Sequence, residues 1–282
     1  MKTLHTVSRV LVTFCMLLGV ISYLPAQEGQ RTQQTKPFQP EVGQPGKDVI
    51  WVPTPQELVD KMLDMAKVTP QDYVIDLGSG DGRTVIAAAK RGAHALGIEY
   101  NPDMVDLSRV NATNEGVSDR ATFMKADLFE TDFSKATVIT MFLLPKINMQ
   151  LRPKLLEMRP GTRVVSNSFN LGDWEPDETA TVFWGCDSYC AALLWIVPAK
   201  VEGRWRIGEG ELALTQHFQK LSGTLTTNGK NMPISAGKMI GDQITFRAGG
   251  TVYTGRLSNN MIEGTATTNS NRVSWSAMRA GN

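Results

Sequence analysis

Residues 74–82 read Val-Ile-Asp-Leu-Gly-Ser-Gly-Asp-Gly, and this stretch decides the fold. Three of its first four residues are apolar, which is typical of a short buried strand, and a helix is expected to begin at Arg83 directly after the glycines. A strand that runs through glycines into a helix places backbone N–H groups beside an anionic or carboxylate-bearing ligand. Gly78 and Gly80 permit a close approach of the backbone and positive φ angles. The stretch therefore predicts a ligand-binding turn.

The spacing of the glycines separates the candidate ligands. The dinucleotide fingerprint Gly-x-Gly-x-x-Gly needs a third glycine where this chain has Arg83, and the lysine of a phosphate-binding P-loop is absent. Two carboxylates, Asp76 and Asp81, lie in the strand end and the turn instead. They suit a ligand that carries an amine as well as a carboxylate. S-adenosylmethionine (SAM) is such a ligand, whereas a pyrophosphate is not.

Two more acidic residues stand at the ends of the next apolar runs. Glu99 ends the run 95–99, and a carboxylate about 20 residues after a glycine turn can accept both ribose hydroxyls. Asp127 ends the run 121–127 and can accept from an adenine amino group, while Asn101 is placed to help at the ribose edge. One such acid can end a strand without binding anything. Three in order, at these spacings, predict a nucleoside pocket.

These residues resemble the class I, seven-strand SAM-dependent methyltransferases. The resemblance rests on the first motif at residues 76–82, the acidic residue Glu99 and the Asp-Leu pair 127–128. It implies an α/β, Rossmann-like seven-strand sheet, mainly parallel with the last strand antiparallel, and SAM as the cofactor. It also implies a set of cofactor-binding residues: Asp76, Gly78, Gly80, Asp81, Glu99, Asn101, Asp127 and Leu128.

Residues 48–198 are similar to a narrower group, the small lysine N-methyltransferases of the ATP synthase c subunit and the adenine nucleotide carrier. The similarity lies in residues 76–83, 97–102 and 142–145, in the upstream Trp-Val-Pro-Thr-Pro at 51–55, and in the pair 164–165 that precedes an Asp-Trp-x-Pro at 173–176. The Asn/Asp-Pro-Pro-Tyr/Phe motif of nucleobase and amide N-methyltransferases is absent, and the apolar run 140–145 suits an aliphatic amine. The resemblance implies a protein lysine or another small amine as acceptor. Trp51, Phe142 and Pro145 are candidates for the acceptor channel, with core packing as the alternative for both aromatic residues.

The pattern along the chain predicts four segments: a signal peptide (1–26), a flexible linker (27–47), the SAM-binding domain (48–200) and an all-β domain (201–282). From residue 73 to 198 strand and helix patterns alternate, which is typical of a parallel sheet covered on both faces. No helical pattern separates the last two strands, so they should form an antiparallel hairpin. After residue 203, six short alternating runs separated by Asn-Gly, Gly-Gly and similar turns predict a meander of six to eight strands, closed or nearly closed into a small barrel.

The N-terminus predicts export. Lys2 and Arg9 precede an uncharged apolar run, residues 10–24, and a small residue, Ala26, follows it. We expect a periplasmic or secreted protein. The alternative is an anchor through residues 10–24, which would place the chain at a membrane.

Charge and cysteine use exclude some partners. Lys and Arg number 29 against 28 Asp and Glu, so no excess of positive charge indicates nucleic acid. Cys186 and Cys190 could form a disulfide across a turn or stay free, and no histidine stands near them to indicate a metal site. Two functions compete: an active methyltransferase, and an exported binding protein that keeps the fold and uses its β domain, for example on an envelope component. A nicotinamide-dependent oxidoreductase is disfavoured by Arg83 and by the lack of a Tyr-x-x-x-Lys relay.

Overall fold

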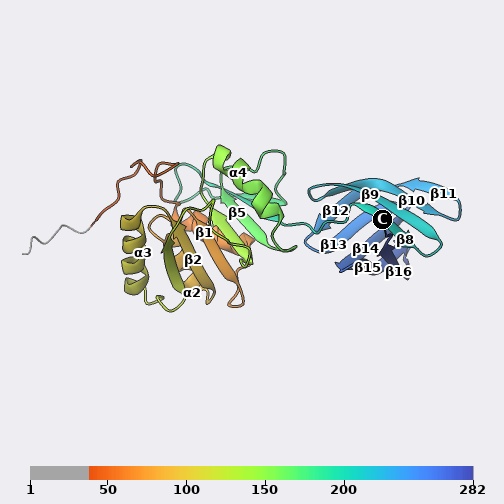
Figure 1. Ribbon diagram of the computed structural model, residues 1–282, viewed down its shortest axis with the longest axis horizontal. Coiled ribbons are helices and arrows are strands. Elements are labelled where there is room, and N and C mark those ends of the chain that lie inside the picture. The colour runs from red at the N-terminus through yellow and green to blue at the C-terminus, as the bar shows by residue number, and fades with distance from the viewer. Residues whose placement is uncertain (1–37, 282) are drawn as a thin grey trace, which may run out of the picture. The chain divides into compact units, whose positions relative to one another are not determined.

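The computed structural model describes residues 38–281 (Figure 1). The predicted signal peptide, the alternative anchor at residues 10–24 and residues 27–37 of the predicted linker lie outside the described residues. Within the described part, no helix combines the length and the apolar character needed to cross a membrane.

The first domain contains the predicted seven-strand sheet. Its order is β3-β2-β1-β4-β5-β7-β6, and only β7 runs antiparallel to its neighbours, β5 and β6. The hairpin predicted for the last two strands is therefore confirmed, with β7 inserted beside β5. The strands are β1 (Tyr73–Leu77), β2 (His94–Glu99), β3 (Ala121–Lys125), β4 (Val138–Met141), β5 (Arg163–Asn167), β6 (Glu178–Thr181) and β7 (Ala191–Ile196).

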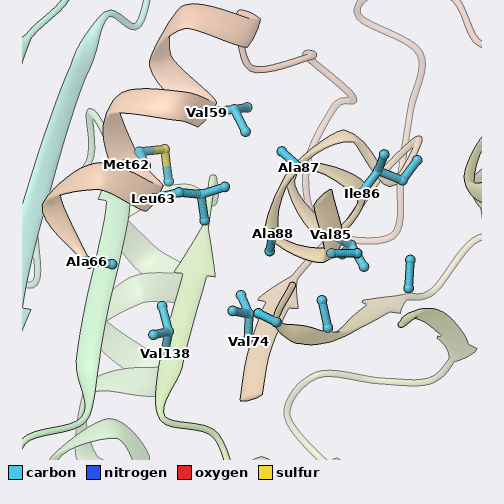
Figure 2. Close-up of a cluster of buried hydrophobic side chains, with 14 of the residues drawn as sticks. Val59, Met62, Leu63, Ala66, Val74, Val85, Ile86, Ala87, Ala88 and Val138 are labelled. Carbon is cyan, nitrogen blue, oxygen red and sulfur yellow. The ribbon is translucent and has the colours of Figure 1, made fainter. Parts of the chain in front are cut away.

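Helices cover both faces of this sheet. Alternate side chains of β1 belong to different cores, with Val74 in one and Ile75 in the other, as the period of two in a strand requires. Helices α1 (Gln56–Met65), α2 (Arg83–Lys90) and α3 (Pro102–Asn114) pack on the Val74 face, and α4 (Pro145–Leu156) packs on the opposite face. Figure 2 shows side chains of α1 and α2 converging above Val74 and Val138.

The second domain is a closed antiparallel barrel. Strands β10, β12, β13, β14, β15, β16, β8 and β9 pair in sequence, and a β9–β10 pairing closes the ring, while β11 extends the β10 edge. The core holds Trp205, Phe246 and Trp275. The strands are β8 (Gly203–Ile207), β9 (Gly210–His217), β10 (Lys220–Thr227), β11 (Lys230–Pro233), β12 (Ser235–Ile240), β13 (Gln243–Ala248), β14 (Thr251–Ser258), β15 (Met261–Thr268) and β16 (Asn271–Arg279).

The segment before α1 is more structured than the sequence predicts. Gly43 donates to the Trp51 carbonyl over 2.8 Å and Trp51 donates to the Gln44 carbonyl over 2.9 Å, with a bridge between Pro45 and Ile50. Residues 43–47, which the sequence assigns to the linker, thus form one side of a narrow loop. Because these bonds join residues on either side of a turn, composition alone does not reveal them.

Candidate active site

One pocket opens at the carboxyl ends of β1, β2 and β4. Ten of the eleven residues that the sequence singles out line it: Trp51, Asp76, Gly78, Gly80, Asp81, Glu99, Asn101, Asp127, Leu128 and Phe142. Pro145, the first residue of α4, does not line it, although its neighbours Leu144 and Ile147 do. The strands of a parallel sheet end at one edge, so residues far apart in sequence meet there.

The glycine turn is built for close approach. Gly78, Gly80 and Gly82 have φ angles of 76°, 54° and 83°. A Cβ on Gly80 would lie 2.7 Å from the Trp51 indole nitrogen, and one on Gly82 would lie 2.7 Å from the Phe123 ring. Side chains are thus excluded at both positions, by conformation and by contact.

Three backbone N–H groups of this turn are bonded within the protein. Gly78 and Ser79 donate to the Ile98 carbonyl over 2.9 and 3.1 Å, and Gly80 donates to a Glu99 carboxylate oxygen over 3.0 Å. The expectation that backbone N–H groups of the turn lie beside a ligand therefore does not hold for these three. The turn offers a ligand the bare surface of its glycines instead.

Asp76 is the buried acid of the site. Only 6% of it is exposed, and its carboxylate accepts a 2.6 Å hydrogen bond from the Thr140 hydroxyl. Burial is the main cause that raises the pKa of Asp76 to about 7; the negative charges of Glu99 and Asp81 add to this shift, and the Thr140 hydrogen bond opposes it. A ligand amine beside this carboxyl would favour its ionised form.

Glu99 organises the loop as well as facing the pocket. Besides Gly80, the backbone N–H groups of Tyr100 and Asn101 donate to it, each over 2.9 Å. Asn101 itself caps α3, since its side chain accepts from the Asp103 N–H over 2.9 Å. A structural task that the sequence does not show thus falls on both residues.

Asp127 has a partner that the sequence does not predict. The ammonium of Lys47 contacts its carboxylate and lies 4.9 Å from the centroid of the Tyr100 ring. The hydrogen bond from Lys47, together with one from the Phe129 N–H at 2.9 Å, lowers the pKa of Asp127. Lys47 thus stands where the sequence analysis expects the adenine amino group.

An aromatic cluster lies at another part of the pocket. Phe142 is 6.1 Å from Phe169 and 5.3 Å from Tyr189 between ring centroids, and all three line the pocket. Trp51 lies apart from them, against the glycine turn. Phe169 and Tyr189 were missed from the sequence; the signal for Tyr189 is its place between Cys186 and Cys190, which form a disulfide.

The residues fit a nucleoside with an amino-acid tail. Buried Asp76 suits the amine, the glycine turn accepts a group pressed against it, and the acids at the ends of β2 and β3 stand along one side of the same pocket. Among the described residues, no group of three or more His, Cys, Asp or Glu is arranged to hold a metal ion.

The chain is similar to known methyltransferases. A family model described as the ANTKMT methyltransferase domain matches residues 76–178. A protein-lysine N-methyltransferase of Saccharolobus islandicus (strain REY15A) is 47% identical over 137 residues, which cover 48% of this chain and 85% of that protein. The chain belongs to this methyltransferase family.

Further relatives support the methyltransferase fold and its cofactor. The adenine nucleotide translocase lysine N-methyltransferase of Mus musculus is 37% identical over 120 residues, covering 42% of this chain but 52% of that protein. A solved structure described as an RNA methyltransferase from Salinibacter ruber in complex with S-adenosyl-L-homocysteine is 46% identical, with a TM-score of 0.50, and covers 53% of this chain and 96% of that one. This methyltransferase is an enzyme that uses SAM. The family match ends before the barrel begins at Gly203.

Proposed function

We propose that the enzyme transfers a methyl group from SAM to the side-chain amine of a lysine in a protein. When bound, SAM supplies the methyl group on a sulfonium. Asp76 would orient its amine, Glu99 the ribose and Asp127 the adenine, while the glycine turn holds the amino-acid part. In this proposal the chain binds, aligns and excludes water: the lysine ammonium loses a proton to solvent, its neutral nitrogen takes the methyl group, and S-adenosylhomocysteine leaves.

The charge of the pocket is the observation that favours lysine over RNA. Five carboxylates and two cationic side chains line it: Asp48, Asp76, Asp81, Glu99 and Asp127 against Lys47 and Arg83. Arg83 is paired with Asp81 at 2.5 Å. A net negative pocket attracts an ammonium group and repels phosphates. The curated relatives, named as lysine methyltransferases, agree with this choice.

Apolar residues at the edge of the pocket also favour lysine as the acceptor. Phe142, Leu143 and Leu144 follow β4, and the aromatic cluster continues the apolar surface. Methylenes of a long side chain can pack along such a surface while the terminal nitrogen reaches inward.

No histidine lines the pocket, so among the described residues no imidazole stands ready as a general base.

The experiment compares acceptor classes with the full-length chain. A peptide with one lysine, the same peptide with arginine or acetyllysine in its place, and a structured RNA are each incubated with methyl-labelled SAM. Label in the lysine peptide alone supports the proposal. Label in the RNA, or in the arginine peptide, with none in lysine, refutes it.

A pair of glycine variants controls for contaminating activity. Gly80→Ala should abolish transfer, since its Cβ meets the Trp51 indole nitrogen at 2.7 Å. Gly116→Ala has a comparable positive φ of 68° but nothing within 4 Å of its Cβ, so it should stay active.

We also propose that the chain is exported through residues 1–26, and that the barrel holds a component of the cell envelope. The Cys186–Cys190 disulfide supports export, because such bonds persist in oxidising compartments. Cell fractionation with mass spectrometry of the mature N-terminus tests the first proposal. A cytosolic, unprocessed chain would refute it and leave the methyltransferase proposal standing.

A further inference from the structure

The aromatic cluster at the pocket is assembled from three separate loops. Phe142 follows β4, Phe169 follows β5, and Tyr189 comes from the loop that joins β6 to β7. The Phe142 and Phe169 rings are stacked at an angle of 20°, and Tyr189 is tilted by 58° and 53° against them, 5.7 Å from Phe169. Three loops that bring rings to one part of a pocket make an apolar, electron-rich wall there.

Tyr189 holds its place under unusual constraints. Its φ angle is 58°, in the left-handed region that costs a non-glycine residue about 1 kcal/mol or more. It is 44% exposed, so burial alone does not fix it. The residue directly after it, Cys190, is bonded to Cys186 and accepts through its carbonyl a 2.9 Å hydrogen bond from the Val182 N–H.

The disulfide closes a five-residue ring that contains Tyr189. A short covalent ring removes most of the alternative conformations of its members. The neighbouring aromatic residues of the loop, Phe183 and Trp184, lie outside the ring and are 82% and 86% exposed. The bridge therefore restrains the one aromatic residue of this loop that lines the pocket.

We propose that Phe142, Phe169 and Tyr189 bind the acceptor's lysine side chain, and that the Cys186–Cys190 disulfide positions Tyr189 for this contact. The inference rests on the proposed function and adds the residues that select the acceptor. Aromatic faces attract an ammonium group and pack against methylenes, and the carboxylates of the pocket reinforce that attraction. Acceptor binding thereby depends on the oxidation state of the loop.

The test separates acceptor binding from donor binding in the full-length chain. Tyr189→Ala should raise the KM for the lysine peptide roughly five- to thirty-fold. Its dissociation constant for SAM, measured by calorimetry, should change by less than about twofold because the donor acids do not contact Tyr189. Tyr189→Phe should restore a near-normal KM, since the ring and not the hydroxyl makes the contact. Phe183→Ala, an exposed aromatic of the same loop, serves as the matched control and should leave both constants unchanged.

The disulfide is tested by non-additivity. Replacing both cysteines by serine should raise the KM to a similar degree, and adding Tyr189→Ala to that variant should raise it little further. Fully additive effects would overturn the positioning role of the bridge. An unchanged KM in Tyr189→Ala, or a parallel loss of SAM affinity, would overturn the aromatic site.

Measurements on the wild-type enzyme distinguish a failure of the aromatic-site proposal from a failure of the proposed lysine methylation. If it binds SAM but methylates no lysine peptide, the lysine proposal falls and takes the aromatic site with it. If it methylates the peptide while Tyr189→Ala behaves as wild type, only the present inference is wrong.

Discussion

Donor affinity should fall steeply as the pH drops below 7, because of Asp76. Burial raises the pKa of this carboxyl to about 7 in the free protein, and only its ionised form pairs with the ligand's amine. Binding should therefore release a proton below pH 7, and affinity should rise with pH through that value. Between pH 5.5 and 7.5 the ionised fraction changes about 25-fold, and the dissociation constant should change by about the same factor.

Calorimetry at a series of pH values, repeated in buffers of different ionisation enthalpy, measures both the affinity and the proton release. The matched ligand is 5′-methylthioadenosine, which has the nucleoside but lacks the amine and carboxylate, and its affinity should stay flat. The matched variant is Asp76→Asn, which should bind SAM weakly at every pH. Equal pH profiles for the two ligands would refute the role of Asp76.

The raised pKa of Asp76 has the opposite effect on the folding stability of the free protein, which falls as the pH rises. The pKa of Asp76 is raised by folding from 3.8 to about 7, so the native state binds the proton more tightly than the unfolded chain does. Stability is therefore lost as the pH rises from about 4 to about 7, by up to about 4 kcal/mol. Asp76→Asn should unfold at a higher denaturant concentration than the wild type at pH 8, and at a similar one at pH 4.

Three further predictions follow from the contacts of the site. Glu99→Ala should weaken SAM binding by about 1–3 kcal/mol. It should also destabilise the first domain by about 3 kcal/mol, because three backbone N–H groups lose a carboxylate acceptor. A variant that unfolds at the same denaturant concentration as the wild type would contradict the predicted loss of stability. Lys47→Met should strengthen SAM binding up to about fivefold because it releases the Asp127 carboxylate, whereas Lys47→Arg should leave the affinity unchanged. If titration calorimetry shows weaker SAM binding in Lys47→Met, the lysine assists donor binding instead. Reduction of the Cys186–Cys190 bridge should lower the unfolding free energy by about 2 kcal/mol in urea titrations with and without reductant, and identical midpoints would show that the loop is already open.

Local patterns explain why the donor half of the site could be predicted. Asp76, Glu99 and Asp127 each follow an apolar run, and a parallel sheet brings the ends of such runs together. What these residues do beyond facing the pocket could not be predicted. Two of the N–H donors of Glu99, and the capping role of Asn101, are set by the turn between β2 and α3, which the pattern does not specify. The third donor, Gly80, comes from the glycine turn after β1.

Contacts between segments that lie far apart in the sequence could not be predicted from local patterns. Lys47 lies 80 positions before Asp127, and nothing in the composition of residues 27–47 indicates that it returns to the pocket. The Thr54 hydroxyl likewise accepts from the side chain of Asn167, 113 positions away, over 3.3 Å, while Pro55 takes the cap position of α1.

In the barrel, the six predicted runs (211–218, 223–226, 243–247, 251–257, 261–267 and 272–278) fall on β9, β10 and β13 to β16. Strands β8, β11 and β12 were not predicted, for local reasons. Strand β8 has five residues and a single buried one, Trp205. Strands β11 and β12 are separated only by Ile234, directly after Pro233, and the register of β12 shifts between Ser235 and Lys238. Ala236 there has a φ angle of 49°, so the alternation of apolar and polar residues is interrupted.

The β6–β7 hairpin gives the enzyme a replaceable part. Its loop, residues 182–190, leaves the sheet on the far side of β5 from the glycine turn, and β6 is the last strand at that edge. An insertion or exchange there would alter no strand that carries a donor-facing acid. Grafting loops of other lengths and sequences onto the same frame is therefore a route to enzymes that keep one methyl source and modify new targets.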